Sequence, residues 1–184
     1  MKKIISSKKI QLIGLENCHL RLLYEWRNCN DFVNNCTHRP IVSFENFVTE
    51  LNNDFESDRH LQYIIQLADG TPIGTVYSYS YNKNDNYLFI TTFLSEKYQS
   101  RGYGVGAFYL FSKSLFDELG LYKIYCDIYE YNKNSLSLFQ KLNISLEGRF
   151  LNQKRVNENR FDVLRYAIYG KDLDALSKYA RFLC

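Results

Sequence analysis

The sequence predicts an α/β (α+β) fold in which a mixed, mostly antiparallel central sheet of about seven strands is flanked by helices. Short apolar runs joined by turns fill most of the first half of the chain, and such runs are typical of antiparallel strands. The second half contains a strand, a helix and another strand in succession, which is the pattern of a parallel crossover. At 184 residues the chain has room for one hydrophobic core and little more, so residues 1–184 are expected to form a single domain.

In the first half, alternation of polar and apolar residues marks the strands, and apolar stripes at helical spacing mark the helices. Ser43 is a suitable N-cap for the second of these helices. Asp69 and Gly70 lie between two alternating runs and form a strong hairpin signal. The expected elements are a strand over 9–15, helices over 20–27 and from 44 onward, and strands over 63–67, 73–81 and 87–94.

The second half begins with a polar loop and a glycine cluster, after which a long helix follows. Gly120 is placed to end that helix as a C′ residue. The polar segment 152–159 is expected to be a loop between the last two strands. The expected elements are helices over 105–118 and 135–142, strands over 123–129, 146–151 and 161–169, and a small helix at the end.

The aromatic content is high, at 16%, with 16 Tyr and 13 Phe. Side chains of this kind can build a large core and also line a cleft with amphipathic walls. Tyr77, Tyr79 and Tyr81 alternate along one expected strand and should share one face of it. Packing beneath a helix is the favoured interpretation, and the wall of an acceptor pocket is the alternative.

Charge and cysteine content exclude several classes of partner. The net charge of +3 is too weak a bias to predict nucleic-acid binding, and the apolar runs are too short to cross a membrane. The five cysteines include no C-x-x-C pair and the three histidines are scattered, so no metal site is expected. Unpaired cysteines in this pattern indicate reduced thiols and a cytoplasmic location.

The most informative segment is the glycine cluster at 98–106. Gly102, Gly104 and Gly106 allow a tight turn in which successive N–H groups face one point. A helix begins directly afterwards, and its first free N–H groups carry a partial positive charge. Together these features predict a seat for a phosphate or pyrophosphate, to which Arg101 could add a charged donor.

Three classes of phosphate loop were compared with this segment. A P-loop requires Gly-Lys-Ser/Thr at its end, and that sequence is absent. The dinucleotide fingerprint is met formally by Gly102, Gly104 and Ala107, with Asp127 as a ribose ligand. It is disfavoured because a polar loop, rather than a strand, runs into the first glycine, and because too little chain follows for the remaining sheet. The third class is an acetyl-coenzyme A loop.

The segment Gln99-Ser-Arg-Gly-Tyr-Gly104 matches the Q/R-x-x-G-x-G/A signature of the GNAT superfamily of N-acetyltransferases, and the chain resembles that family over nearly its whole length. Asn132-Lys-Asn-Ser135 resembles the family's N-x-x-S/A element at the expected spacing. The early Trp26-Arg27-Asn28 and the late Leu146-Glu-Gly-Arg149 are similar to the branch that contains ribosomal-protein N-terminal, polyamine and amino-sugar acetyltransferases. Leu142-Asn-Ile144 departs from the family's usual L-G-F.

The resemblance implies a GNAT-like acyl-CoA N-acyltransferase fold with acetyl-CoA as cosubstrate. Main-chain N–H groups of the signature loop would bind the pyrophosphate, and the pantetheine arm would pair like an added strand with the fourth strand of the family fold. The cofactor-binding residues implied are Thr92, Phe93, Leu94, Gln99, Ser100, Arg101, Gly102, Tyr103, Gly104, Val105, Gly106, Asn132 and Ser135.

The resemblance also implies direct attack of an amine on the thioester, with the oxyanion held by the N–H of Phe93 or Leu94. Two departures concern the proton transfers. Phe139 stands where many members have a tyrosine acid, and no carboxylate is present in 87–90, where many have a glutamate base. Tyr129 and Tyr131 are the nearest hydroxyls by topology and are the catalytic candidates, with simple packing as the alternative for each.

The acceptor expected from this branch is a small-molecule amine, such as an amino sugar or a polyamine, rather than a protein N-terminus. Asp54, Glu56 and Asp58 lie where the branch forms its acceptor cleft and would attract a cationic amine, or would simply be solvated. The missing acid and base leave a non-catalytic acyl-CoA-binding module as the rival. A homodimer is a further possibility, because dimers are common in this branch.

Overall fold

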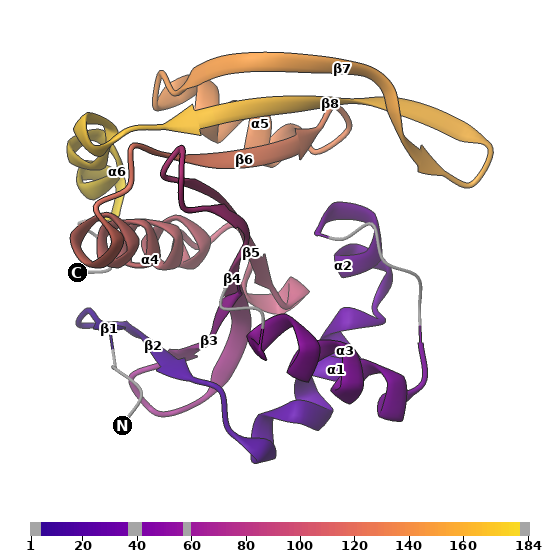
Figure 1. Cartoon of the computed structure of the whole chain (residues 1–184). Helices are drawn as coiled ribbons and strands as arrows, with labels where there is room; N and C mark the ends of the chain where they lie inside the picture. Colours follow the sequence, from indigo (N-terminus) through magenta and orange to yellow (C-terminus); the bar gives the residue numbers. More distant parts are fainter. Residues whose placement is uncertain (1–4, 37–41, 57–59, 181–184) are drawn as a thin grey trace.

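The computed structural model describes residues 5–36, 42–56 and 60–180. Within these ranges, eight strands form one sheet in the order β1-β2-β3-β4-β5-β6-β8-β7 (Figure 1). Neighbouring strands are antiparallel except for β5 and β6, which are parallel. The mixed, mostly antiparallel sheet flanked by helices is therefore confirmed, with one strand more than the expected seven.

The strands are β1 (Ile5–Ser6), β2 (Ile10–Gly14), β3 (Leu61–Leu67), β4 (Pro72–Asn82), β5 (Tyr87–Leu94), β6 (Lys123–Tyr129), β7 (Ser145–Val156) and β8 (Asn159–Ile168). The α-helices are α1 (Leu20–Arg27), α2 (Asn30–Asn35), α3 (Phe44–Glu56), α4 (Tyr103–Leu119), α5 (Lys133–Lys141) and α6 (Leu173–Ala180). Short 3₁₀ turns precede α1, α4 and α6, at η1 (Asn17–His19), η2 (Glu96–Tyr98) and η3 (Gly170–Asp172).

Helices cover both faces of the sheet, and each face has its own core. Figure 1 shows α1, α2 and α3 on one side and α4 with α6 on the other. The larger core lies under α4 and includes the fully buried Phe111, Val76 and Ile124. The smaller one lies under α1 and α3 around Leu23 and Phe47. Burial on both faces explains why β4 and β5 contain few charged residues.

Strands β5 and β6 pair only over their first residues. The register joins Tyr87 to Lys123, Leu88 to Ile124 and Phe89 to Tyr125, and the pairing ends there. Beyond that point, residues 90–94 of β5 still pair with β4 on one side but have lost their partner strand on the other. The parting of β5 and β6 therefore opens a gap in the middle of the sheet.

Three details differ from the sequence-based expectation. The polar segment 152–159 is not a loop but continues β7 and β8, with a tight turn after Val156 in which Asn157 has φ 54°. Helix α2 was not expected, because six residues with little apolar periodicity give no helical signal. The two-residue strand β1, also unexpected, is the additional strand.

The expectation that Tyr77, Tyr79 and Tyr81 share one face is wrong for Tyr81. Ser80 has φ 53° and the register with β5 shifts after Tyr79, which is the geometry of a β-bulge. The extra residue turns Tyr81 toward the larger core, whereas Tyr77 and Tyr79 line a cavity on the opposite face.

Gly74 on β4 supports a testable prediction, because a Cβ there would lie 2.1 Å from the carbonyl oxygen of Phe93 and 2.9 Å from a methyl group of Leu94. Backbone must shift to admit it, so Gly74→Ala is expected to lower the free energy of unfolding by about 1–3 kcal/mol in urea titrations. Gly148→Ala is the matched control, since its Cβ would meet Phe150 at an ordinary 3.4 Å. Equal stability of the two variants would contradict the prediction.

Candidate functional site

The gap between β5 and β6 opens into a cavity of about 1060 Å³. Its walls are the unpaired edge of β5, the glycine loop, the end of β6 and the start of α5. The predicted residues that line it are Thr92, Phe93, Leu94, Gln99, Ser100, Gly102, Gly104, Val105, Asn132 and Ser135. The fold thus gathers most of the predicted cofactor residues around one cavity, named here the large cavity.

Three predicted residues do not line the large cavity. Gly106 is buried inside α4, where its N–H donates to the Gly102 carbonyl at 3.1 Å. Tyr103 packs against the larger core, and Arg101 is exposed to solvent. A direct role in binding stays a prediction for these three.

The glycine loop turns into α4 with its main-chain N–H groups concentrated at one end. Gly102 is the N-cap with φ 85°, and Ser100 before it also has a positive φ of 58°. The first helical N–H groups have no partner within the helix and carry a partial positive charge, which suits a phosphate group. Gln99 differs from its neighbours: its N–H donates to the Glu96 carbonyl at 3.1 Å, so this amide is already used.

The edge of β5 presents the remaining groups that an acyl-coenzyme A would need. Beyond Phe89, the main-chain groups that do not pair with β4 face the large cavity in place of a paired strand, so the amides of an extended ligand can complete the sheet. Two carbonyls on this edge already accept hydrogen bonds, that of Ile90 from Cys126 and that of Leu94 from Gln99. The buried hydroxyl of Thr92 has no hydrogen-bond partner among the described residues. An unsatisfied buried donor is costly, and a ligand in this cavity could satisfy it.

Asn132 caps α5 beside this edge. Its Oδ1 accepts from the Ser135 N–H at 3.2 Å, and its own N–H donates to the Tyr129 carbonyl at 2.8 Å. An asparagine amide has a separate donor nitrogen, so the capping bond leaves Nδ2 able to donate into the large cavity.

A smaller cavity of about 220 Å³ lies between the sheet and α1–α3. Phe32, Tyr77 and Tyr79 give it aromatic walls, and Tyr77 donates to the Cys36 carbonyl at 2.6 Å. Its acidic lining residues are Glu50, Asp54 and Asp127. The large and small cavities share Asn35, Cys36, Thr91 and Asp127, so they meet where β5 and β6 part.

Of the acidic residues expected in this region, Asp54 lines the small cavity. Asp58 and the side chain of Glu56 lie outside the described part of the chain, so their role in binding the acceptor stays a prediction. Glu50 and Asp127 were not among the expected acceptor residues. Glu50 lies one helical turn before Asp54 on α3, a spacing that brings both to one helix face.

The structure separates the two catalytic candidates. Tyr129 lines the small cavity and is 4% exposed, and burial raises the pKa of its hydroxyl well above the usual value. Tyr131 lines the large cavity, where its hydroxyl donates to the Asn34 carbonyl and burial raises its pKa to about 12. Both hydroxyls are therefore protonated near neutral pH. Phe139 is packed edge-on against Phe108 and supplies no proton.

Helix α2 lies over the junction of the cavities and is held by hydrogen bonds from several other elements. Sequence reasoning missed both this helix and Lys154, whose side chain is buried although the rest of β7 is largely exposed. A lysine in a polar run carries no signal of burial, because only the register shift between Phe150 and Lys154 turns it inward. The donors are Gln99 to Asp31 Oδ2 at 2.6 Å, Lys154 to the Val33 carbonyl at 3.4 Å, Tyr131 to the Asn34 carbonyl and Tyr77 to the Cys36 carbonyl.

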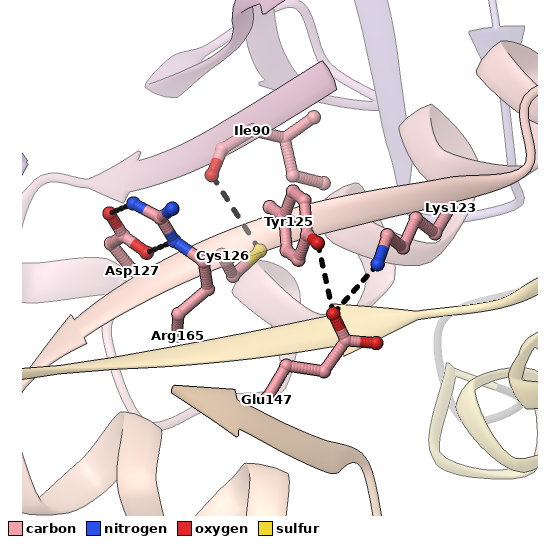
Figure 2. A network of polar contacts seen from close by, with 7 residues as sticks. All are labelled: Ile90, Lys123, Tyr125, Cys126, Asp127, Glu147 and Arg165. Atoms are coloured by element: carbon pink, nitrogen blue, oxygen red, sulfur yellow. Dashed lines mark hydrogen bonds and ion pairs between the residues drawn. The ribbon is translucent and has the colours of Figure 1, made fainter. Parts of the chain in front are cut away.

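A polar network lies on β6 next to the gap (Figure 2). Arg165 donates from Nε and Nη2 to the two carboxylate oxygens of Asp127, each at 2.8 Å. The thiol of Cys126 donates to the Ile90 carbonyl, the first on β5 beyond the last residue paired with β6, at 3.6 Å. A second carboxylate in this network, that of Glu147, accepts hydrogen bonds from Lys123 and Tyr125.

The described residues show neither a metal site nor a membrane-spanning helix. Across 5–36, 42–56 and 60–180 no group of His, Cys, Asp or Glu side chains is arranged to hold a metal ion. In the same ranges, every helix is too short or too polar to cross a bilayer.

Residues 10–145 match the sequence model of the acetyltransferase (GNAT) domain. The spermidine N(1)-acetyltransferase of Escherichia coli K12 is 21% identical over 164 residues, which cover 89% of this chain and 88% of that protein. Among solved structures, the spermidine N-acetyltransferase of Vibrio cholerae with CoA and spermine has a TM-score of 0.84 at 19% identity, covering 91% of this chain and 99% of that one. The ribosomal L7/L12 α-N-protein acetyltransferase RimL with CoA has a TM-score of 0.79 at 16% identity, covering 91% and 98%.

The two enzymes of known structure support the fold, and the family match covers most of the chain, including the glycine loop and Asn132. The signature in the sequence, the parted strands and this match agree. The chain belongs to the GNAT acetyltransferase family and is an N-acetyltransferase that uses acetyl-CoA as its cosubstrate.

Proposed function

We propose that the chain, as one N-acetyltransferase domain over 1–184, acetylates a primary amine of a cationic small molecule of the polyamine class. The observation that carries this proposal is the small cavity, which is lined by three carboxylates, Glu50, Asp54 and Asp127, and by one arginine, Arg27. Asp127 also lines the large cavity. Carboxylates attract ammonium groups, and a polyamine offers several along one chain. The similarity to spermidine N-acetyltransferases supports the same substrate class.

In this proposal the large cavity binds acetyl-CoA. The N–H groups from Ser100 to Val105 hold the pyrophosphate at the start of α4, and Gln99 positions the loop through its side chain rather than through its N–H. The pantetheine arm pairs with the free edge of β5, with Asn132 donating to it from the opposite wall. The thioester then lies near the junction, where holding both reactants in place supplies much of the rate.

Proton transfers in the proposed reaction use groups on both sides of the junction. The amine attacks as the neutral form, so its ammonium first loses a proton. The oxyanion is held by the N–H of Phe93 or Leu94 on the β5 edge. Tyr131 lines the large cavity and is the proposed proton donor to the departing thiolate, although its hydroxyl donates to the Asn34 carbonyl in this structure. Tyr129 forms part of the acceptor wall.

An amino sugar is the second candidate acceptor. The aromatic walls formed by Phe32, Tyr77 and Tyr79 offer apolar surface for a sugar ring, and the Gln62 and Asn35 amides offer partners for hydroxyl groups. A volume of about 220 Å³ suits a small molecule better than the N-terminus of a folded protein.

The expected association of two chains into a homodimer stays a prediction.

The direct test is release of CoA thiol from acetyl-CoA with a panel of spermidine, a hexosamine and a peptide with a free N-terminus. We expect the highest kcat/KM with spermidine, because its second and third ammonium groups meet the acidic lining. A hexosamine as the best substrate would replace the polyamine with the second candidate. Tight CoA binding without turnover of any amine would instead support the non-catalytic acyl-CoA-binding module.

A loop variant tests the acetyl-CoA assignment. In Gly104→Val the new side chain would enter the large cavity beside Leu94, where a Cβ already lies 3.4 Å from a methyl group. The Kd for CoA measured by calorimetry is expected to rise by about tenfold or more, with little change in the melting temperature. Gly170→Val is the matched control, because a Cβ at Gly170 meets no atom within 4 Å and lies in η3, away from the loop. Normal CoA binding by Gly104→Val would overturn the loop assignment.

A charge variant tests the acceptor class. Asp54→Asn removes one carboxylate from the small cavity and is expected to raise KM for spermidine by about 3- to 10-fold, while KM for a monoamine changes less. Asp85→Asn is the control, since Asp85 lies in the exposed turn between β4 and β5. An equal rise in KM for monoamine and polyamine would argue against charge-based recognition of a polycation.

A further inference from the structure

Asp127 occupies an unusual place in the sheet. Alternation along β6 directs Lys123, Tyr125 and Asp127 to one face, whereas Cys126 and Ile128 belong to the larger core on the other. Tyr125 is the last residue of β6 that pairs with β5. Asp127 is therefore the first residue on the acceptor face beyond the point where the strands part.

This position makes Asp127 part of both cavities. It lines the small cavity together with Tyr79, and the large cavity together with Thr92 and Asn132. Of the carboxylates that line the small cavity, Glu50 and Asp54 come from α3 and do not reach the large one. In the proposed arrangement, the amine in the small cavity must reach the thioester in the large cavity. Its nitrogen therefore comes to the junction, where Asp127 lies.

Arg165 holds the Asp127 carboxylate in position. It is the cross-strand neighbour of Asp127 on β8 and binds both carboxylate oxygens (Figure 2). Its guanidinium also lies 4.7 Å from the ring centre of Phe89. The hydrogen bonds to Asp127 raise the pKa of Arg165. Each carboxylate oxygen retains a second lone pair, so the fixed anion can still accept from a substrate ammonium.

We propose that Asp127 is a catalytic residue that binds the reacting ammonium of the acceptor at the junction of the two cavities. The inference rests on the proposed assignment of the cavities but not on the identity of the amine, because every primary amine arrives mainly as an ammonium. The ammonium donates to Asp127 and loses one proton to water. The neutral nitrogen then forms the N–C bond to give the oxyanion, whose collapse breaks the C–S bond. The nitrogen loses its second proton and the thiolate gains one, so that amide, CoA thiol and the one proton released to water result.

The alternative is that the pair with Arg165 only ties β6 to β8. Glu147 provides a comparison inside the same region (Figure 2). It joins β7 to β6 through Lys123 at 2.7 Å and Tyr125 at 2.9 Å, and it lines neither cavity. If the Asp127 carboxylate is purely structural, neutralising it should affect amine binding and turnover no more than neutralising Glu147 does. If it binds substrate, the effect should be larger.

The experiment compares Asp127→Asn with Glu147→Gln, because each substitution removes one charge and keeps the size of the side chain. Calorimetry measures the Kd for spermidine and for a hexosamine on the protein saturated with CoA, and the Kd for CoA itself. Thiol release gives kcat and KM for the amine that the wild type uses best. We expect Asp127→Asn to weaken amine binding and to lower kcat/KM by about tenfold or more, while its Kd for CoA stays within about twofold of the wild type. In Glu147→Gln we expect the Kd for the amine, the kcat/KM and the Kd for CoA all to stay at the wild-type values.

Amine affinity and kcat/KM of Asp127→Asn close to the wild type would overturn the proposal, as would an equal loss in Glu147→Gln. If Asp127→Asn does not fold, Asp127→Glu keeps the charge and is expected to retain part of the amine affinity. Its complete loss, with CoA binding intact, would count against a role for the charge. Binding of no amine by the CoA-loaded wild type would overturn the proposed function and this inference together, whereas amine binding unaffected by Asp127→Asn would overturn this inference alone.

Discussion

The early parting of β5 from β6 is the constraint on which the rest of the site depends. Were the strands paired to their ends, the β5 edge at 90–94 would be used within the protein and no ligand could complete the sheet. The same parting creates the large cavity, joins it to the small one, and exposes Asp127 to both. Cys126 accommodates the break by donating its thiol to the Ile90 carbonyl, which would otherwise lack a strand partner (Figure 2).

A gap in the middle of a sheet weakens the connection between its two parts, and α2 restores it. This six-residue helix accepts hydrogen bonds from the glycine loop at the Asp31 side chain, and from the residues after β6 and from β7 at main-chain carbonyls. The Cys36 carbonyl that follows the helix accepts from Tyr77 on β4. The last carbonyls of a helix have no partner within it, so they are free to receive such donors. Gln99 contributes one of these bonds while also donating to the Leu94 carbonyl at 2.9 Å. The coenzyme loop and the acceptor side are thereby connected through one side chain.

The proposed reaction divides charge and proton handling between the two cavities. Phe139 stands where the family resemblance implies a tyrosine; it packs against Phe108 and Tyr166 and lines the large cavity. In the proposed reaction the proton comes instead from Tyr131, which lies after β6 and lines the large cavity. Glu50 and Asp54 line only the small cavity and Asp127 lines both, so a cationic amine that approaches through the small cavity would meet carboxylates on its way to the junction.

The sequence by itself determined seven of the eight strands, most of the helices, the glycine turn before α4 and the membership of the family, because these depend on local periodicity and on glycines at fixed spacing. Residues 87–94 and 123–129 were predicted as the strands now seen, and Gly120 ends α4 with φ 58° as expected. Only the tertiary structure decided where β5 and β6 part, that α2 covers the junction and that Lys154 turns inward. These features depend on pairing and on bulges between segments far apart in the chain. Such contacts are set by the packing of the whole sheet, and they leave no periodic pattern in any one segment.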